Sequence, residues 1–163
     1  MRPENADLKK LIYCSKGVWI VIQGDCMKEI EGMRDAFKHA KIVNLTTFSN
    51  KEEKSRPMTN FNDDPYEVIW FPTDKNTRKV EDIKKNPKVL ITFPSSKKCE
   101  YFEIEGKAEF EKEAVVAEKW QWWYLYWHPE QKDRFWFPTD EHVANRAIIN
   151  VYPISARVVK KRK

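Results

Sequence analysis

The stretch Tyr101-Phe102-Glu103-Ile104-Glu105-Gly106-Lys107-Ala108-Glu109-Phe110 alternates apolar and charged residues around Phe102 and Ile104. In a β-strand, successive side chains point to opposite faces, so this alternation predicts a strand with one buried face. The preceding run Lys88-Val89-Leu90-Ile91-Thr92-Phe93 also predicts a strand. With the strands expected upstream, four or five of them fall within about seventy residues, which is typical of an all-β unit.

A β-hairpin is expected upstream, because Lys41–Phe48 and the extended segment Ser55–Phe61 flank the polar turn 49–54. Pro57 cannot donate a ladder hydrogen bond. Its strand is therefore expected at an edge of the sheet, or where the sheet opens beside a ligand.

A further strand, Glu67–Phe71, leads through a loop into a short helix over Arg78–Lys85, with Val80 and Ile83 facing inward. Asn86-Pro87 stops this helix.

Two longer helices complete the pattern. Met27–Phe37 has helical spacing, and in the segment Lys112–Trp127 one stripe carries Val116, Trp120, Trp123 and Trp127. We interpret the aromatic run Trp120–Trp127 as buried packing or a dimer interface rather than as a lid over a ligand.

The last strand pair is expected at Ala147–Tyr152 and Ala156–Val159. Many short strands with few crossover helices predict a mainly β (α+β) protein, built as a small antiparallel barrel with peripheral helices.

Composition limits the possible functions. The 163 residues suit one domain, and the net charge of +5 lies partly in the tail 160–163. Aromatic and basic residues are not interleaved as in RNA-binding motifs, so no nucleic-acid partner is expected. Neither a dinucleotide-binding nor a P-loop glycine pattern can be written with four glycines, and three cysteines without C-x-x-C spacing suggest neither disulfides nor zinc. The longest apolar run near the start, Val18–Ile22, is too short to span a bilayer, so a cytoplasmic protein is expected.

Arg78 and Lys79 are the strongest candidates for a binding site. They fall in the first turn of a helix, where the helix dipole and the unpaired N–H groups already carry positive charge. A bound phosphate would remove this conflict. The alternative for Arg78 and Lys79 is a solvated charge pair on a surface helix. Arg56 is a further candidate for a cofactor contact, and its alternative is a surface ion pair with Glu52 or Glu53.

Five motifs, in this order and spacing, resemble the FMN-binding split barrels related to pyridoxamine 5′-phosphate oxidase, most closely their general-stress-protein branch. They are Arg56-Pro57-Met58, Phe71-Pro72-Thr73, Thr77-Arg78-Lys79-Val80, Asn86-Pro87-Lys88-Val89 and Gly106-Lys107-Ala108-Glu109. The resemblance covers residues 27–159, which leaves 1–26 as an N-terminal extension of unknown role and 160–163 as a basic tail.

The resemblance implies a six-stranded antiparallel split barrel that forms a homodimer with FMN at the subunit interface. It places the flavin phosphate at Arg78 and Lys79, the ring edge at residues 56–59, the ribityl and ring region at Pro72 and Thr73, and Tyr101 against the cofactor of the other subunit. No catalytic residue and no metal ligand is implied. The residues expected to bind the cofactor are Arg56, Pro57, Met58, Thr59, Phe71, Pro72, Thr73, Thr77, Arg78, Lys79 and Tyr101.

The function implied is that of a flavoprotein oxidoreductase, passing electrons or hydride between FMN and a small molecule. True pyridoxamine phosphate oxidases carry a Trp and an Arg-Leu-His-Asp-Arg segment beyond the final strand, where this chain has Val158–Lys163. Oxidation of vitamin B6 is therefore not expected. The alternatives are a flavin-binding, stress-related module without turnover and a relative that binds the deazaflavin F420.

Overall fold

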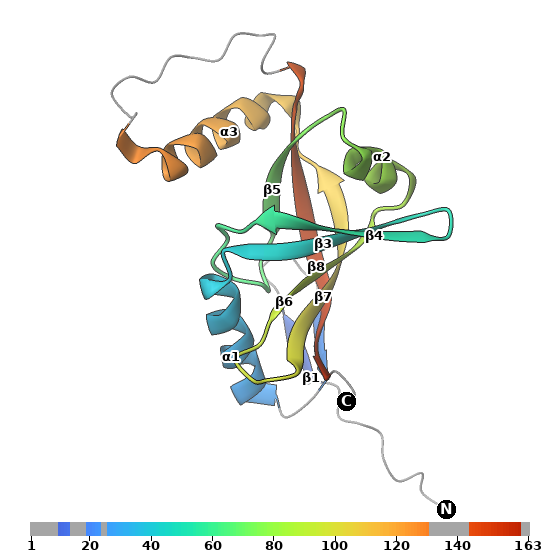
Figure 1. The fold of residues 1–163 in the computed structure, drawn as a ribbon, viewed down its shortest axis with the longest axis vertical. Coiled ribbons are helices and arrows are strands. Elements are labelled where there is room, and N and C mark those ends of the chain that lie inside the picture. Colours follow the sequence, from blue (N-terminus) through green and yellow to red (C-terminus); the bar gives the residue numbers. More distant parts are fainter. Residues whose placement is uncertain (1–9, 14–18, 24–25, 131–143, 161–163) are drawn as a thin grey trace, which may run out of the picture.

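The computed structural model describes residues 10–13, 19–23, 26–130 and 144–160, with side chains from residue 31 onward. Three helices and eight strands follow one another in these residues (Figure 1). Their bounds are β1 Lys10–Tyr13, β2 Trp19–Gln23, α1 Cys26–His39, β3 Ile42–Ser49, β4 Glu52–Thr59, β5 Ile69–Asp74, α2 Arg78–Lys85, β6 Lys88–Pro94, β7 Glu100–Phe110, α3 Glu113–Trp127 and β8 Arg146–Lys160.

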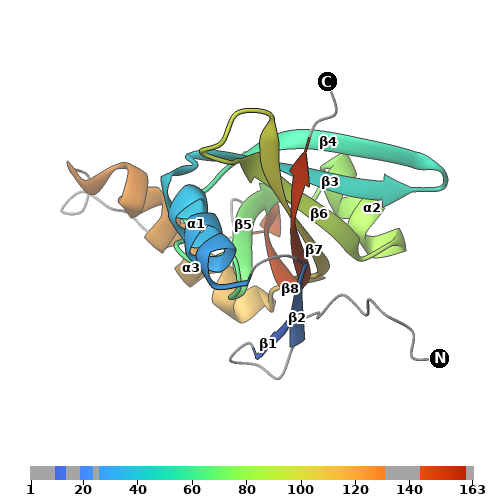
Figure 2. The same cartoon turned by 90° about the horizontal axis from the view of Figure 1, so that it is seen from below.

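One sheet contains all the strands of the described residues, in the order β1-β2-β8-β7-β6-β3-β4, and β5 pairs with β8 off this path. The six strands β3 to β8 pair antiparallel and curl into an open barrel (Figure 2). This confirms the predicted mainly β split barrel. β4 ends the sheet order, so Pro57 lies on an edge strand as expected.

β8 differs from the prediction. The sequence predicts two strands, but β8 is a single strand of 15 residues that continues through Pro153. Pro153 is opposite Gly106, where the register between β7 and β8 shifts at a bulge. A bulge interrupts the hydrogen-bond ladder, so a proline is tolerated there and the strand does not end.

The N-terminal strands extend the sheet. β2 pairs antiparallel with β1 and parallel with the second half of β8, and β5 lies along the first half of the same edge. Residues 10–13 and 19–23 therefore contribute strands to the same sheet. The tips of the chain, 1–9 and 161–163, lie outside the described residues.

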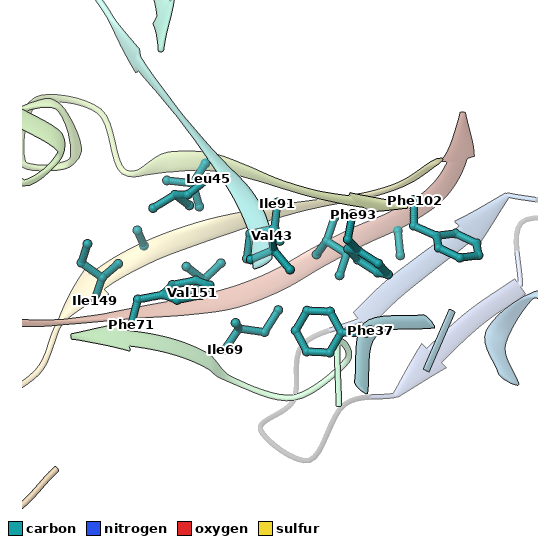
Figure 3. Packing of buried hydrophobic residues seen from close by; sticks show 14 of the residues in the cluster. Phe37, Val43, Leu45, Ile69, Phe71, Ile91, Phe93, Phe102, Ile149 and Val151 are labelled. Carbon is teal, nitrogen blue, oxygen red and sulfur yellow. The ribbon is translucent and has the colours of Figure 1, made fainter. Parts of the chain in front are cut away.

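The core fills the inside of the curled sheet. Side chains from alternate positions of the strands meet there, and Phe37 of α1 packs edge-on against Phe93 with ring centroids 5.1 Å apart (Figure 3). Burial of this apolar surface is the main stabilising term. Fully buried members include Leu45, Ile69, Phe71, Val89, Ile91, Ile104, Ile149 and Val151.

Candidate functional site

Helix α2 begins at Arg78 and ends at Lys85, as the sequence predicts. Thr77 occupies the N-cap position with extended backbone, φ −95° and ψ 149°. Its hydroxyl donates to the Asp74 carbonyl at 2.9 Å and lies 3.4 Å from the Thr73 hydroxyl, and it does not cap the helix. Because no side chain among the described residues caps α2, the first N–H groups of the helix are available to an acceptor from outside it.

Arg56 and Lys79 come together from two different elements, the edge strand β4 and the helix α2. Burial and the nearby Arg56 guanidinium both lower the pKa of Lys79, and Asp74 acts in the opposite sense. Like charges that lie near each other while partly buried disfavour each other's charged form, and here Asp82 and Asp74 offset this effect in part. The expectation that both contact one phosphate stays a prediction.

The Arg56 guanidinium is only partly satisfied. Its Nη2 lies 3.6 Å from Oδ2 of Asp82, and its side chain is 22% exposed. Its Nη1 is buried and has no hydrogen-bond partner among the described residues. A buried donor without an acceptor costs free energy, so the hydrogen-bonding capacity of Arg56 is not fully used by the described residues. The alternative partners Glu52 and Glu53 are not the ones paired with Arg56; its partner is Asp82.

Arg78 is the most exposed of the three cations. It lies close enough to the hairpin to contribute, after the larger effect of Lys54, to the lowered pKa of Glu52. The two adjacent cations at the start of α2 thus differ: Lys79 is half-buried near Arg56, and Arg78 is exposed.

The side chains of residues 56–59 are divided between two faces of β4. Arg56 and Met58 are partly buried on the inner face, where Met58 packs against the core, and Pro57 and Thr59 are exposed on the outer face. A single ligand on one face can contact only one of these pairs through side chains. It would reach the other pair through the backbone.

β5 shows the same division. The Phe71 side chain is fully buried in the core, so any contact with a ligand would come from its backbone. Thr73 is buried beside Thr77, and Pro72 lies on the opposite face with Trp70. Lys119 of α3 covers Trp70, with its ammonium 5.4 Å from the ring centroid.

Tyr101 is remote from α2 within one chain. It pairs with Pro94 at one end of the β6–β7 ladder, whereas Lys88, three residues after α2, pairs with Lys107 at the other end. The six residues from Tyr101 to Lys107 span roughly 20 Å along a strand. The expected contact of Tyr101 with the cofactor of the other subunit stays a prediction.

Sequence reasoning missed one residue of this cluster, Asp82. Its side chain is 5% exposed, accepts a hydrogen bond from Thr47 Oγ1 at 2.9 Å and faces Arg56. A signal was present, because Asp82 follows Lys79 by three residues and precedes the inward-facing Ile83. This spacing places Asp82 on the same side of α2 as Lys79.

The aromatic run on α3 is only partly buried. Val116 is the one buried residue of α3, whereas Trp122 and Tyr126 of the aromatic run are 50% and 52% exposed and lie with Phe61 and Trp70 in one aromatic cluster. The side chains of α3 thus do not all belong to a core within one chain.

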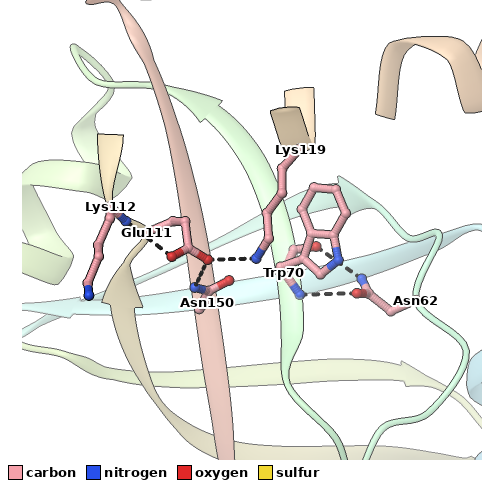
Figure 4. Close-up of polar contacts among 6 residues, drawn as sticks. All are labelled: Asn62, Trp70, Glu111, Lys112, Lys119 and Asn150. Carbon is pink, nitrogen blue, oxygen red and sulfur yellow. Dashed lines mark hydrogen bonds and ion pairs between the residues drawn. The ribbon is translucent and has the colours of Figure 1, made fainter. Parts of the chain in front are cut away.

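Polar contacts fasten the start of α3 to the barrel (Figure 4). The Glu111 carboxylate accepts hydrogen bonds from Lys119 Nζ at 2.6 Å, from Asn150 Nδ2 at 2.9 Å and from the Lys112 amide at 3.2 Å. The Trp120 indole N–H donates to the Ala147 carbonyl at 3.2 Å. Both Asn150 and Ala147 belong to β8, so α3 is fixed to that strand.

The family model described as pyridoxamine 5′-phosphate oxidase like matches residues 28–159, four-fifths of the chain and all of the cluster just described. The chain belongs to this family. Among its relatives, General stress protein 26 of Bacillus subtilis (strain 168) is 36% identical to the chain over 90 residues. The match covers 52% of this chain and 61% of the relative. The chain thus matches about six-tenths of that protein's length.

Solved structures share the fold of this chain. General Stress Protein 26 from Bacillus anthracis str. Sterne has a TM-score of 0.59 and 24% identity, with 82% of this chain and 95% of that chain covered. A protein named F420 Reductase has a TM-score of 0.53 and 21% identity, with 76% and 94% covered. At these identities the likeness shows the fold. In the described part of the chain, no helix has both the length and the apolar composition needed to cross a membrane.

Proposed function

We propose that the chain is a cytoplasmic flavoprotein that binds FMN through a phosphate site formed by Arg56, Arg78 and Lys79. The observation that supports this most is the buried Arg56 Nη1, which has no acceptor among the described residues and lies in a cluster of three cations. A phosphate monoester supplies several acceptor oxygens and two negative charges, so it satisfies this donor and relieves the repulsion between the cations.

The remaining phosphate contacts come from short polar groups. The amides of Arg78 and Lys79 in the first turn of α2 and the hydroxyl of Thr73 lie next to the cations and can donate to phosphate oxygens, whereas the Thr77 hydroxyl already donates to the Asp74 carbonyl. The chain thus supplies a positively charged cradle built from β4, β5 and α2.

The residues that would border a bound flavin ring lie on the edge strand β4 and at the end of β5. They are Met58 with Arg56 on one face of β4, or Pro57 with Thr59 on the other, and Pro72 of β5. A second copy of the chain contributes Tyr101, which is too remote within one chain. The functional unit is therefore a homodimer with two equivalent sites.

Bound flavin supplies hydride or single-electron transfer to a small-molecule partner. The chain's own residues bind and orient the cofactor and exclude water. No side chain of the cluster is needed as a general acid or base.

A deazaflavin is the alternative cofactor, favoured by the shared fold with a protein named F420 Reductase. Because F420 carries a phosphodiester and an acidic tail, it would use the same cations differently. The visible absorption spectrum of the purified protein separates the two chromophores. Failure of NADH, NADPH and a panel of other donors to reduce the bound chromophore would instead favour a binding module without turnover.

Removing both first-turn cations tests the phosphate site. Arg78→Ala combined with Lys79→Ala removes two charge-assisted contacts, so we expect the affinity for FMN to fall on the order of 100- to 10,000-fold. The variant should elute colourless from gel filtration, whereas the wild type elutes yellow.

The matched control is Lys84→Ala combined with Lys85→Ala. These two lysines are exposed in the last turn of the same helix, so the control removes the same charge far from the cradle. It should remain yellow. Full retention of FMN by the Arg78/Lys79 variant would contradict the assignment.

A further inference from the structure

Asp82 is an unusual residue for its position. Helix α2 reads RKVEDIKK and is charged along most of its length, yet Asp82 is 4% exposed. Burying a carboxylate is unfavourable unless charges and hydrogen bonds compensate it. A neutral residue would pack α2 against the sheet with less cost, so the carboxylate calls for a role beyond packing.

The contacts of Asp82 connect three elements. Its Oδ2 accepts a hydrogen bond from Thr47 Oγ1 of β3 at 2.9 Å and lies 3.6 Å from Arg56 Nη2 of β4. Thr47 is fully buried and sits on the same face of the hairpin as Arg56, since Leu45 pairs with Arg56 and Thr47 with Lys54. One carboxylate oxygen on α2 therefore holds both strands of the hairpin.

This contact restricts the Arg56 guanidinium. The group is planar, with its N–H donors in a fixed fork, so an anchor at Nη2 also fixes the direction of Nη1. Nη1 is the buried donor without a partner among the described residues. Arg56 also acts on Lys79, which stands one helical turn before Asp82 on α2.

From this geometry we propose that Asp82 is a positioning residue of the flavin-phosphate site: it anchors Arg56 Nη2 so that Nη1 faces the phosphate beside Lys79. This inference rests on the proposed function, because it concerns the same phosphate. Thr47 completes the arrangement by fixing the carboxylate that fixes the guanidinium.

Two competing roles of Asp82 predict different effects on flavin binding. If Asp82 only reduced the positive charge of the cluster, its neutralisation would strengthen the binding of a phosphate dianion. If it only held α2 in place, its loss would weaken the binding of phosphorylated and unphosphorylated flavins alike. The two flavins FMN and riboflavin, which differ only by the phosphate, therefore separate the three roles.

The test is Asp82→Asn, which keeps the size of the side chain and an acceptor for Thr47 but removes the ionic anchor of Arg56. We expect the dissociation constant for FMN to rise roughly 10- to 100-fold and that for riboflavin to change by less than about twofold. Both constants are measured by flavin fluorescence quenching. Unchanged or tighter FMN binding overturns the inference. Equal weakening for both flavins also overturns it.

Two comparisons make the result specific to Arg56. Glu81→Gln removes one negative charge from the neighbouring, exposed position of the same helix, and we expect FMN binding at least as tight as in the wild type. In an Arg56→Ala background, Asp82→Asn should cause no further loss of FMN affinity, because the group that it positions is gone. Additive losses in the double variant would contradict the positioning role.

A second variant covers the case in which Asp82→Asn fails to fold. Thr47→Val keeps the shape of a buried side chain and removes the hydrogen bond to Asp82, so FMN affinity should fall by a smaller factor while riboflavin affinity stays the same. An unchanged ratio of the two affinities overturns the inference. Wild-type protein that does not bind FMN overturns the proposed function itself, whereas wild-type binding with no effect of either variant overturns only the role of Asp82.

Discussion

At the scale of single residues, the Glu111 carboxylate accepts three hydrogen bonds. The hydrogen bonds from the Lys119 and Asn150 side chains, followed by the Lys112 amide and the charge of Lys119, lower the pKa of Glu111 to about 2 from 4.5. Its side chain is 18% exposed, so solvent screens these contacts only in part. Glu111 therefore stabilises the folded state as a carboxylate.

The stability of the protein should depend on pH through this residue. A folded-state pKa below the unfolded one stabilises the protein at pH values above 4.5, and the stabilisation is lost as pH falls from 4.5 toward 2. We expect Glu111→Gln to lower the free energy of unfolding by roughly 2–3 kcal/mol at neutral pH and by progressively less below the unfolded pKa. Urea unfolding of both proteins across this range measures the difference.

Glu118→Gln is the control for this prediction. Glu118 is exposed on α3, so its substitution should change the free energy of unfolding by less than about 0.5 kcal/mol at any pH. A difference between wild type and Glu111→Gln that stays constant with pH would contradict the ionic role of Glu111.

The residues of the candidate site show what sequence reasoning could reach. Arg78 and Lys79 were predicted because two cations at a helix start break a local electrostatic rule, and the helix does begin at Arg78. Asp82 was missed because an acid in a charged helix looks like a solvated surface residue. Its importance depends on Thr47 and Arg56, which the fold brings to it from another part of the chain.

At the scale of elements, the contact between β7 and β8 depends on one glycine. A Cβ on Gly106 would lie 2.6 Å from Val151 Cγ1 and 2.9 Å from the Tyr152 carbonyl oxygen. The second neighbour is backbone and cannot move without disturbing β8. Gly106 therefore allows the two strands to approach each other at the bulge opposite Pro153.

The same substitution should have opposite effects at two glycines. Gly106→Ala should destabilise the protein by about 1–3 kcal/mol, because the added methyl group overpacks the strand pair. Gly32→Ala should stabilise it by about 0.5–1 kcal/mol, because Gly32 lies in α1 with nothing within 4 Å of an added Cβ. Thermal or urea unfolding compares them, and a neutral Gly106→Ala would contradict the close approach.

Elements were predictable where local signals agree. Residues Asn86 and Pro87 mark the end of α2, and alternation marks β7, so both were placed correctly. The sequence predicts two strands in place of β8, and Pro153 lies in the gap between them. The bulge that accommodates Pro153 is formed with Gly106 of another strand, and no local pattern reveals it.

At the scale of the whole molecule, the proposed site combines parts of two copies of the chain. The cluster of cations lies at α2 and β4, and Tyr101 lies toward the end of the β6–β7 ladder opposite to Lys88. If two copies combine these parts, each site contains Arg78 and Lys79 of one subunit and Tyr101 of the other. The exposed aromatic residues of α3 are further apolar surface that one chain leaves uncovered.

Mixing two defective variants tests this arrangement. Lys79→Ala and Tyr101→Ala should each bind FMN more weakly than the wild type as homodimers. When equal amounts are unfolded and refolded together, half of the dimers are mixed and each has one intact site, so about one site in four should regain wild-type affinity. Flavin titration of the mixture against the separate variants measures the recovery. The absence of recovery, or a mass of 19.5 kDa in light scattering, would contradict the shared site.

The length of β8 has a consequence for how the chain reaches its native state. β8 pairs with β2, β5 and β7, and it follows all three in the sequence, so that Val21 must find Ser155 across most of the polypeptide. Contacts between such distant positions slow folding, because a large loop must close before any of them forms. During synthesis the three earlier strands therefore wait with open edges until β8 leaves the ribosome, and this interval is when the nascent chain is most prone to aggregate.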